Sequence, residues 1–122
     1  MRSSRVILLV EPDDRIRVTF QVVLKREGFV VLEATNAVDA LEQVREAEPE
    51  LVVTDMRLPR SSGAKLIRTI RAEAGASPVH VLALGPETTR REALSSGANA
   101  FQPTPVAAEN LVKAVTTLIG RA

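Results

Sequence analysis

The chain has 122 residues, of which 45% are hydrophobic, and its 16 basic and 15 acidic side chains leave a net charge of +1. This length allows one hydrophobic core, so we expect residues 1–122 to form a single domain. The balanced charge argues against a nucleic-acid surface dominated by phosphate contacts. The absence of cysteine excludes disulfides and thiolate ligands, and no apolar run reaches the roughly 20 residues that cross a membrane.

Short apolar runs alternate with segments of helical period along the chain, which is the pattern of repeated βα units around a parallel sheet. The five predicted strands are Val6–Val10, Val30–Ala34, Leu51–Thr54, Val79–Leu84 and Ala100–Gln102. Between them, apolar residues three and four positions apart predict amphipathic helices. Four helical faces are clear: Ile16, Phe20, Val23 and Leu24; Ala37, Ala40, Leu41 and Val44; Leu66, Ile67, Ile70 and Ala74; and Leu111, Ala114, Val115 and Leu118. A further helix around Thr88–Ser96 has a weaker apolar face.

Turn and cap residues support this partition. Asn36 precedes the second helical segment and is a favoured helix cap, while Gly75 and Pro78 separate the third helix from the fourth strand. Thr104 followed by Pro105 predicts the start of the last helix, with proline in its first turn. Right-handed crossovers with helices on both faces then give a doubly wound sheet, whose ligand crevice lies beyond the carboxyl ends of its strands.

Acidic residues gather at that edge of the predicted sheet. Glu11, Asp13 and Asp14 follow the first strand, and Asp55 follows the third. Carboxylates a few ångströms apart repel one another by roughly 1 to 4 kcal/mol, so we expect a cation to neutralise them. Magnesium is the natural candidate, since it prefers oxygen ligands and often joins one or two carboxylates to a phosphate. A carboxylate beside such an ion can act as a nucleophile and form an acyl phosphate.

The segment Asp55–Pro59, which reads DMRLP and is followed by Gly63, resembles the phosphoacceptor loop of bacterial response-regulator receiver domains. The segment Gly97–Phe101 resembles the stretch that leads into the fifth strand of that family. The resemblance covers nearly the whole chain. It implies a flavodoxin-like (βα)5 fold, a three-layer sandwich whose five parallel strands have the order 2-1-3-4-5. It also implies a signalling domain of a two-component system and not an enzyme.

The resemblance further implies roles for single residues. Asp55 takes phosphate from a histidine kinase or a phosphotransfer protein, and Glu11, Asp55 and the backbone carbonyl of Arg57 hold Mg²⁺. Phe101 matches the aromatic residue that changes rotamer on activation in typical members.

The amino terminus lacks the long apolar stretch of a secretion signal, so the expected compartment is the cytoplasm. We expect no nucleic acid or membrane as a partner of this domain.

The first departure from the family pattern concerns the acidic pair after the first strand. Pro12 follows Glu11 and stands where members usually carry a second acid that contacts the metal directly. Asp13, one residue further on, would have to swing in to replace that ligand. Alternatively, Asp13 or Asp14 caps the first helix, since both precede the periodic stretch and aspartate is a favoured cap.

Two further departures concern the residues that contact the phosphoryl group in the family. Ala83 stands where members usually have a Thr or Ser hydroxyl, and Leu84 at the next position, usually small, narrows the approach to Asp55. Thr104 stands in place of a lysine, so that a fixed positive charge is lost. The switch positions of this chain are therefore Ala83, Phe101 and Thr104.

Arg57 offers one compensation for the missing lysine. It lies two residues past Asp55, and its guanidinium is suited to bidentate pairing with a carboxylate or phosphate. One hypothesis is that Arg57 pairs with Asp55 or Glu11 in the resting protein as an internal counterion. The alternative is a solvated loop arginine.

These observations leave different functions open. The first is a receiver that accepts phosphate at Asp55 through a weakened magnesium site. The second is a pseudo-receiver, a phosphorylation-independent interaction module; by analogy with the family, its surface, and that of a homodimer, comprises the fourth helix, fifth strand and fifth helix. A flavin-binding protein shares the strand order, but only Phe20, Phe29 and Phe101 are available to stack on a flavin ring.

Overall fold

The computed structural model describes residues 5–73 and 79–122. Five parallel strands form one sheet in the order β2-β1-β3-β4-β5, as predicted. The strands are β1 (Val6–Val10), β2 (Val30–Ala34), β3 (Leu51–Asp55), β4 (His80–Gly85) and β5 (Ala100–Pro103). The helices are α1 (Asp14–Arg26), α2 (Ala37–Ala47), α3 (Gly63–Glu73), α4 (Arg90–Ser96) and α5 (Ala108–Ile119), with a short 3-10 helix, Glu87–Thr89, before α4.

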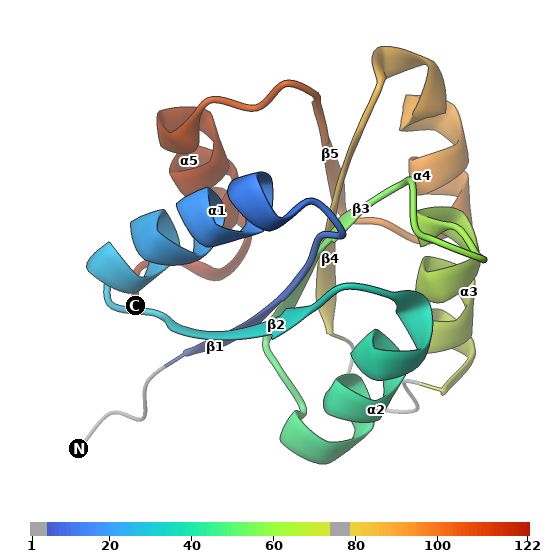
Figure 1. Ribbon diagram of the computed structural model, residues 1–122, viewed down its shortest axis with the longest axis horizontal. Helices are drawn as coiled ribbons and strands as arrows, with labels where there is room; N and C mark the ends of the chain where they lie inside the picture. The colour runs from blue at the N-terminus through green and yellow to red at the C-terminus, as the bar shows by residue number, and fades with distance from the viewer. Residues whose placement is uncertain (1–4, 74–78) are drawn as a thin grey trace.

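The sheet separates two hydrophobic cores. Helices α1 and α5 cover one face, and α2, α3 and α4 cover the other (Figure 1). Because successive side chains of a strand point to opposite faces, Ile7 and Leu9 of β1 belong to the core beneath α1 and α5, whereas Leu8 and Val10 belong to the other core. All four side chains are fully buried. Burial on both faces explains why this strand is an unbroken apolar run and not an alternating one.

The structure corrects both predicted ends of β4 and the predicted start of α5. Strand β4 begins at His80 instead of Val79 and continues one residue further, to Gly85. The last helix begins at Ala108 and not directly after Thr104. The reason is that the backbone N–H of Thr104 donates to the carbonyl of Gly85 at 2.8 Å, so that the chain still follows β4 at this point and turns into the helix only later.

The predicted cap of the second helix is present. The side chain of Asn36 accepts a hydrogen bond from the backbone N–H of Asp39 at 2.9 Å, which satisfies a donor at the start of α2. The predictions that involve Ala74, Gly75 and Pro78 lie outside the described residues.

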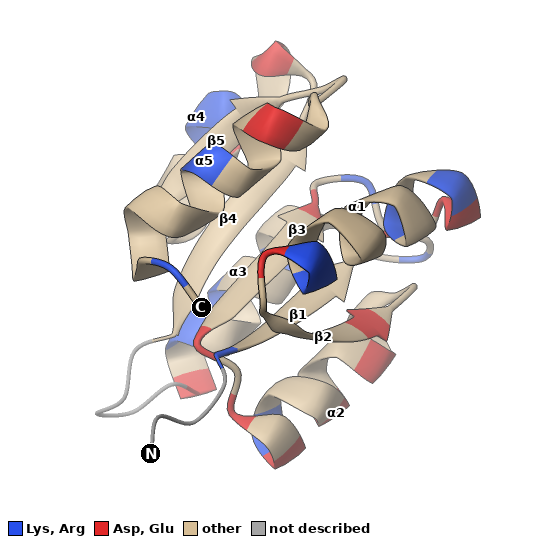
Figure 2. Ribbon diagram, turned by 90° about the vertical axis from the view of Figure 1, so that its left-hand side faces the viewer, with Lys and Arg blue, Asp and Glu red and all other residues tan. Residues whose placement is uncertain are grey.

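Within the described residues, no helix has the length and apolar character needed to cross a membrane. At both ends of α1, acidic residues lie next to basic ones (Figure 2).

Arg71 ties α3 to the neighbouring strands. Its guanidinium donates to the carbonyls of Gly97 and Val79 and, at 2.8 Å, to Oδ1 of Asn99. The same Asn99 oxygen accepts the backbone N–H of Val81 at 2.8 Å. Arg71 therefore supports the register of β4 and the turn that precedes β5.

Candidate functional site

The carboxyl ends of β1 and β3 bring two of the predicted acids together. These strands are parallel neighbours with Val10 opposite Thr54, so the residues that follow in each chain, Glu11 and Asp55, lie at the same edge of the sheet. The backbone N–H of Glu11 donates to the carbonyl of Ala34 at 3.0 Å, which holds this segment against β2. The side chain of Glu11 is buried and that of Asp55 is half-buried.

The proximity of the two carboxyls changes the acidity of Glu11. The pKa of Glu11 is raised from 4.5 to about 7, chiefly by burial and in smaller part by the charge of the nearby Asp55 and a hydrogen bond with it. The backbone N–H of Asp13 donates to the Glu11 carboxylate at 3.1 Å and opposes this rise. Without a cation, Glu11 therefore keeps its proton below about pH 7.

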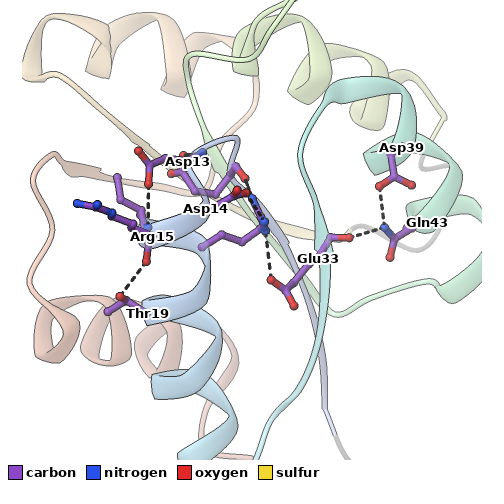
Figure 3. Close-up of polar contacts among 10 residues, drawn as sticks. Asp13, Asp14, Arg15, Thr19, Glu33, Asp39 and Gln43 are labelled. Atoms are coloured by element: carbon purple, nitrogen blue, oxygen red, sulfur yellow. Dashed lines mark hydrogen bonds and ion pairs between the residues drawn. The ribbon is translucent and has the colours of Figure 1, made fainter.

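Asp13 and Asp14 have other partners. Asp13 is the N-cap of α1, and its Oδ1 accepts the backbone N–H of Ile16 at 3.0 Å (Figure 3). Asp14 forms an ion pair with Arg17, with 2.6 Å between Oδ1 and Nη2. The sequence left two roles open for Asp13, a metal ligand and a helix cap, and in the structure its side chain caps α1. In the part of the chain that the structure describes, no three His, Cys, Asp or Glu side chains form a candidate metal-binding group.

Arg17 is a member of this region that the sequence reasoning missed. Its guanidinium donates to the backbone carbonyl of Glu11 at 2.9 Å, pairs with Asp14, and reaches Oε1 of Glu33 on β2 at 3.2 Å (Figure 3). It thereby fixes the β1–α1 turn that carries Glu11. The three-residue spacing of Asp14 and Arg17 predicts an ion pair on one face of a helix. The contact of Arg17 with Glu33, in contrast, depends on the pairing of β1 with β2.

The loop after β3 is held by backbone contacts around Asp55. The backbone N–H of Arg57 donates to Oδ1 of Asp55 at 2.7 Å, and that of Gly63 donates to the carbonyl of Met56 at 2.9 Å. A Cβ atom at position 63 would lie 2.5 Å from the Asp55 carbonyl oxygen, so only glycine allows this close return of the chain.

The structure does not show the ion pair proposed for Arg57. Its side chain is exposed, and its contact with Asp55 is made by the backbone N–H. Among the described residues, no carboxylate lies within ion-pair distance of its guanidinium. The physical reason is that the Asp55 oxygen is already bonded to the loop backbone while the Arg57 side chain extends into solvent.

A pocket of about 280 Å³ opens beside the two acids. It is lined by Glu11, Arg15, Ile16, Thr19, Phe20, Asp55, Leu84, Thr104, Pro105 and Val106. Leu84 lies directly opposite Asp55 in the β3–β4 ladder and is buried, so it forms a wall of the pocket next to the carboxylate. Thr104 lines the opening from the β5–α5 connection.

The other two predicted switch positions lie in the core on the opposite face of the sheet. Ala83 and Phe101 are Cα partners in the β4–β5 ladder, and both are buried. The Arg90 guanidinium carbon lies 4.9 Å from the centre of the Phe101 ring, and Arg90 also pairs with Glu87 at 2.5 Å. Phe101 is therefore in an inward position covered by a cation.

The family and the relatives of the chain agree with this geometry. A family model described as the response regulator receiver domain matches residues 7–116. Transcriptional regulatory protein SrrA of Staphylococcus aureus is 31% identical over 118 residues, which cover 97% of this chain and 49% of that protein. The chain thus spans about half the length of the curated relatives it matches.

Solved structures show the same fold. A putative response regulator from Chloroflexus aurantiacus has a TM-score of 0.91 at 24% identity, covering 98% of this chain and 100% of that chain. The receiver domain of the sensor histidine kinase PA1611 from Pseudomonas aeruginosa has a TM-score of 0.87 at 24% identity, with 97% and 99% covered. That structure carries a magnesium ion in its active-site cleft.

Proposed function

The chain belongs to the response regulator receiver domain family of two-component systems, and on this basis we propose that Asp55 is its phosphoacceptor. The donor is a histidine kinase or a phosphotransfer protein. The observation that carries the proposal is the position of Asp55, half-buried at the end of β3, beside Glu11 and on the wall of an open pocket. A nucleophile in this place is accessible to a donor and partly shielded from water.

In the proposed reaction, a carboxylate oxygen of Asp55 forms a bond to phosphorus while the bond from phosphorus to the donor nitrogen of phosphohistidine breaks. The electron pair of the broken bond stays on the imidazole nitrogen. The product on this chain is an acyl phosphate. The hydrogen bond from the Arg57 N–H to Oδ1 orients the Asp55 carboxylate, so that the other oxygen is the one left for attack.

The oxygen atoms present suit Mg²⁺, although fewer of them are available than in typical members. The carboxylates of Glu11 and Asp55 and the backbone carbonyl of Arg57 are hard donors of the kind that magnesium prefers. Asp13 is occupied as a helix cap, and Pro12 offers no side-chain ligand. When bound, the ion would neutralise the charge that builds up between Asp55 and the phosphoryl group. The magnesium ion in the PA1611 receiver supports this assignment.

We further propose that the phosphorylation switch is weaker than in typical members. Thr104 carries no charge, and Leu84, which lies opposite Asp55 in the β3–β4 ladder, narrows the approach to Asp55 from the side of β4. Ala83 lies in the core on the other face of the sheet and does not line the pocket. The proposed output or homodimer surface is formed by α4, β5 and α5, where Leu94 is 44% exposed.

The experiment is phosphorylation by acetyl phosphate with Mg²⁺, followed by intact-mass measurement. We expect a mass gain of one phosphoryl group in the wild type and none in Asp55→Asn, which removes the nucleophile while keeping the shape of the side chain. Glu92→Gln, which removes an exposed carboxylate on α4, is the matched control and should behave as the wild type. An unmodified wild-type protein would refute the proposal and leave the pseudo-receiver reading.

A further inference from the structure

The proposed phosphoacceptor site needs a positive charge, and neither Thr104 nor Arg57 provides one. A phosphoryl group on Asp55 adds negative charge beside Glu11, while Thr104 is neutral and the Arg57 side chain is exposed without a carboxylate partner among the described residues. A bound magnesium ion would neutralise part of this charge, and in the family a lysine neutralises the rest, so a site without that lysine is unfavourable. A cation should therefore face the pocket from another element.

Arg15 is the only basic residue among the described residues that line this pocket. It lies in the first turn of α1, and the same pocket is lined by Glu11 and Asp55. Figure 3 shows its side chain directed away from Asp14 and Glu33, on the other side of the helix. In the described part of the chain, no ion pair engages its guanidinium, in contrast to that of Arg17.

Helix stability does not explain an arginine at this position. The first turn of a helix carries the positive end of the dipole, so a cation there is unfavourable, and α1 already has acidic residues at its start in Asp13 and Asp14. Arg15 is exposed and does not contribute to either hydrophobic core. A residue that is disfavoured where it stands, and that lines the same pocket as the two acids, points to a role in the site.

We infer that Arg15 supplies the cation that contacts the phosphoryl oxygens on Asp55, in place of the family's lysine. This inference rests on the proposed phosphorylation of Asp55. The guanidinium has two parallel donors that match a phosphoryl group, and Ile16, Phe20 and Leu84 line the same pocket with apolar surface, which strengthens the interaction between charges. The bond changes are those of the transfer to Asp55: Arg15 keeps its protons and donates hydrogen bonds to the oxygens that carry the charge.

The test compares phosphorylation rates with a small donor, so that no partner surface is involved. With acetyl phosphate and Mg²⁺, the bond from phosphorus to the acetyl oxygen breaks and acetate leaves with its electron pair. We expect Arg15→Ala to lower the initial rate about tenfold, less than the loss of a fully preorganised donor because Arg15 is exposed. Its thermal midpoint should be equal to or above that of the wild type, because a cation is removed from the helix start.

A rescue variant and a binding measurement separate a contact from an indirect effect. The double variant Arg15→Ala with Thr104→Lys, which returns a cation to the lining of the same pocket, should recover most of the rate. Beryllofluoride, a stable phosphoryl analogue, should bind Arg15→Ala about tenfold more weakly than the wild type by fluorine NMR. Arg91→Ala, which removes an exposed arginine on α4, is the matched control and should leave both quantities unchanged.

Each outcome bears on the inference. Equal rates and equal beryllofluoride affinities in Arg15→Ala and Arg91→Ala would overturn the role of Arg15 while the phosphoacceptor assignment stands. A lower rate that Thr104→Lys does not recover, with unchanged beryllofluoride affinity, would also overturn it. A wild-type protein that neither gains a phosphoryl group nor binds beryllofluoride would refute the proposed function and this inference together.

Discussion

Replacing Glu11 with Gln should change how the stability of the protein depends on pH. The Glu11 pKa is raised from 4.5 to about 7, chiefly by burial, and each pKa unit corresponds to about 1.4 kcal/mol. Below pH 4.5 the carboxyl is protonated in the folded and the unfolded chain alike. Between pH 4.5 and about 7 the unfolded chain releases this proton and the folded chain retains it, so the folded state loses stability as the pH rises.

The expected size of this loss is about 3 kcal/mol, complete above about pH 7. Gln has the shape of a protonated Glu, can accept the Asp13 N–H and can donate to Asp55. Glu11→Gln should therefore match the wild type in acid and exceed its free energy of unfolding by about 3 kcal/mol in mildly alkaline buffer.

Urea unfolding at a series of pH values from 4.5 to 8, with a chelator present, measures this difference. Glu92→Gln removes an exposed carboxylate and controls for the loss of one negative charge. A constant difference between Glu11→Gln and the wild type across the series would show that Glu11 does not titrate in this window. Added Mg²⁺ at pH 8 should stabilise the wild type more than the variant, because the ion binds the charged carboxylate.

Two further substitutions test the walls of the site and its support. Leu84→Ala should lower the free energy of unfolding by about 2–5 kcal/mol, because the Leu84 side chain is buried. The same substitution should raise the rate of phosphorylation by acetyl phosphate, because it opens the pocket beside Asp55. An unchanged rate would mean that Leu84 does not limit access to Asp55. Arg71→Ala should lower the free energy of unfolding by about 2–4 kcal/mol, because the carbonyls of Gly97 and Val79 lose a charged donor. Urea unfolding beside Arg91→Ala measures this loss, and equal curves for the two variants would show that these hydrogen bonds contribute little to stability.

The helix boundaries show where local patterns are sufficient. Asn36 was recognisable as a cap because its partner, Asp39, lies three residues away in the same helix. The start of α5 was placed too early because Thr104 followed by Pro105 resembles a local helix start. The backbone N–H of Thr104 instead donates to the carbonyl of Gly85, nineteen positions earlier in the chain, and no local sequence pattern predicts such a partner.

The order of the elements, the doubly wound sheet and the edge at which Glu11 and Asp55 meet could all be predicted from the amino-acid sequence. This was possible because the period of apolar residues distinguishes strands from helices, and parallel strands place their carboxyl ends together. The pairing of the charged groups, in contrast, became clear only from the three-dimensional structure. Asp13 caps α1, Arg17 joins α1 to Glu33, and the Arg57 guanidinium stays in solvent, because each outcome depends on side-chain directions and on contacts between distant segments, which spacing along the chain does not encode.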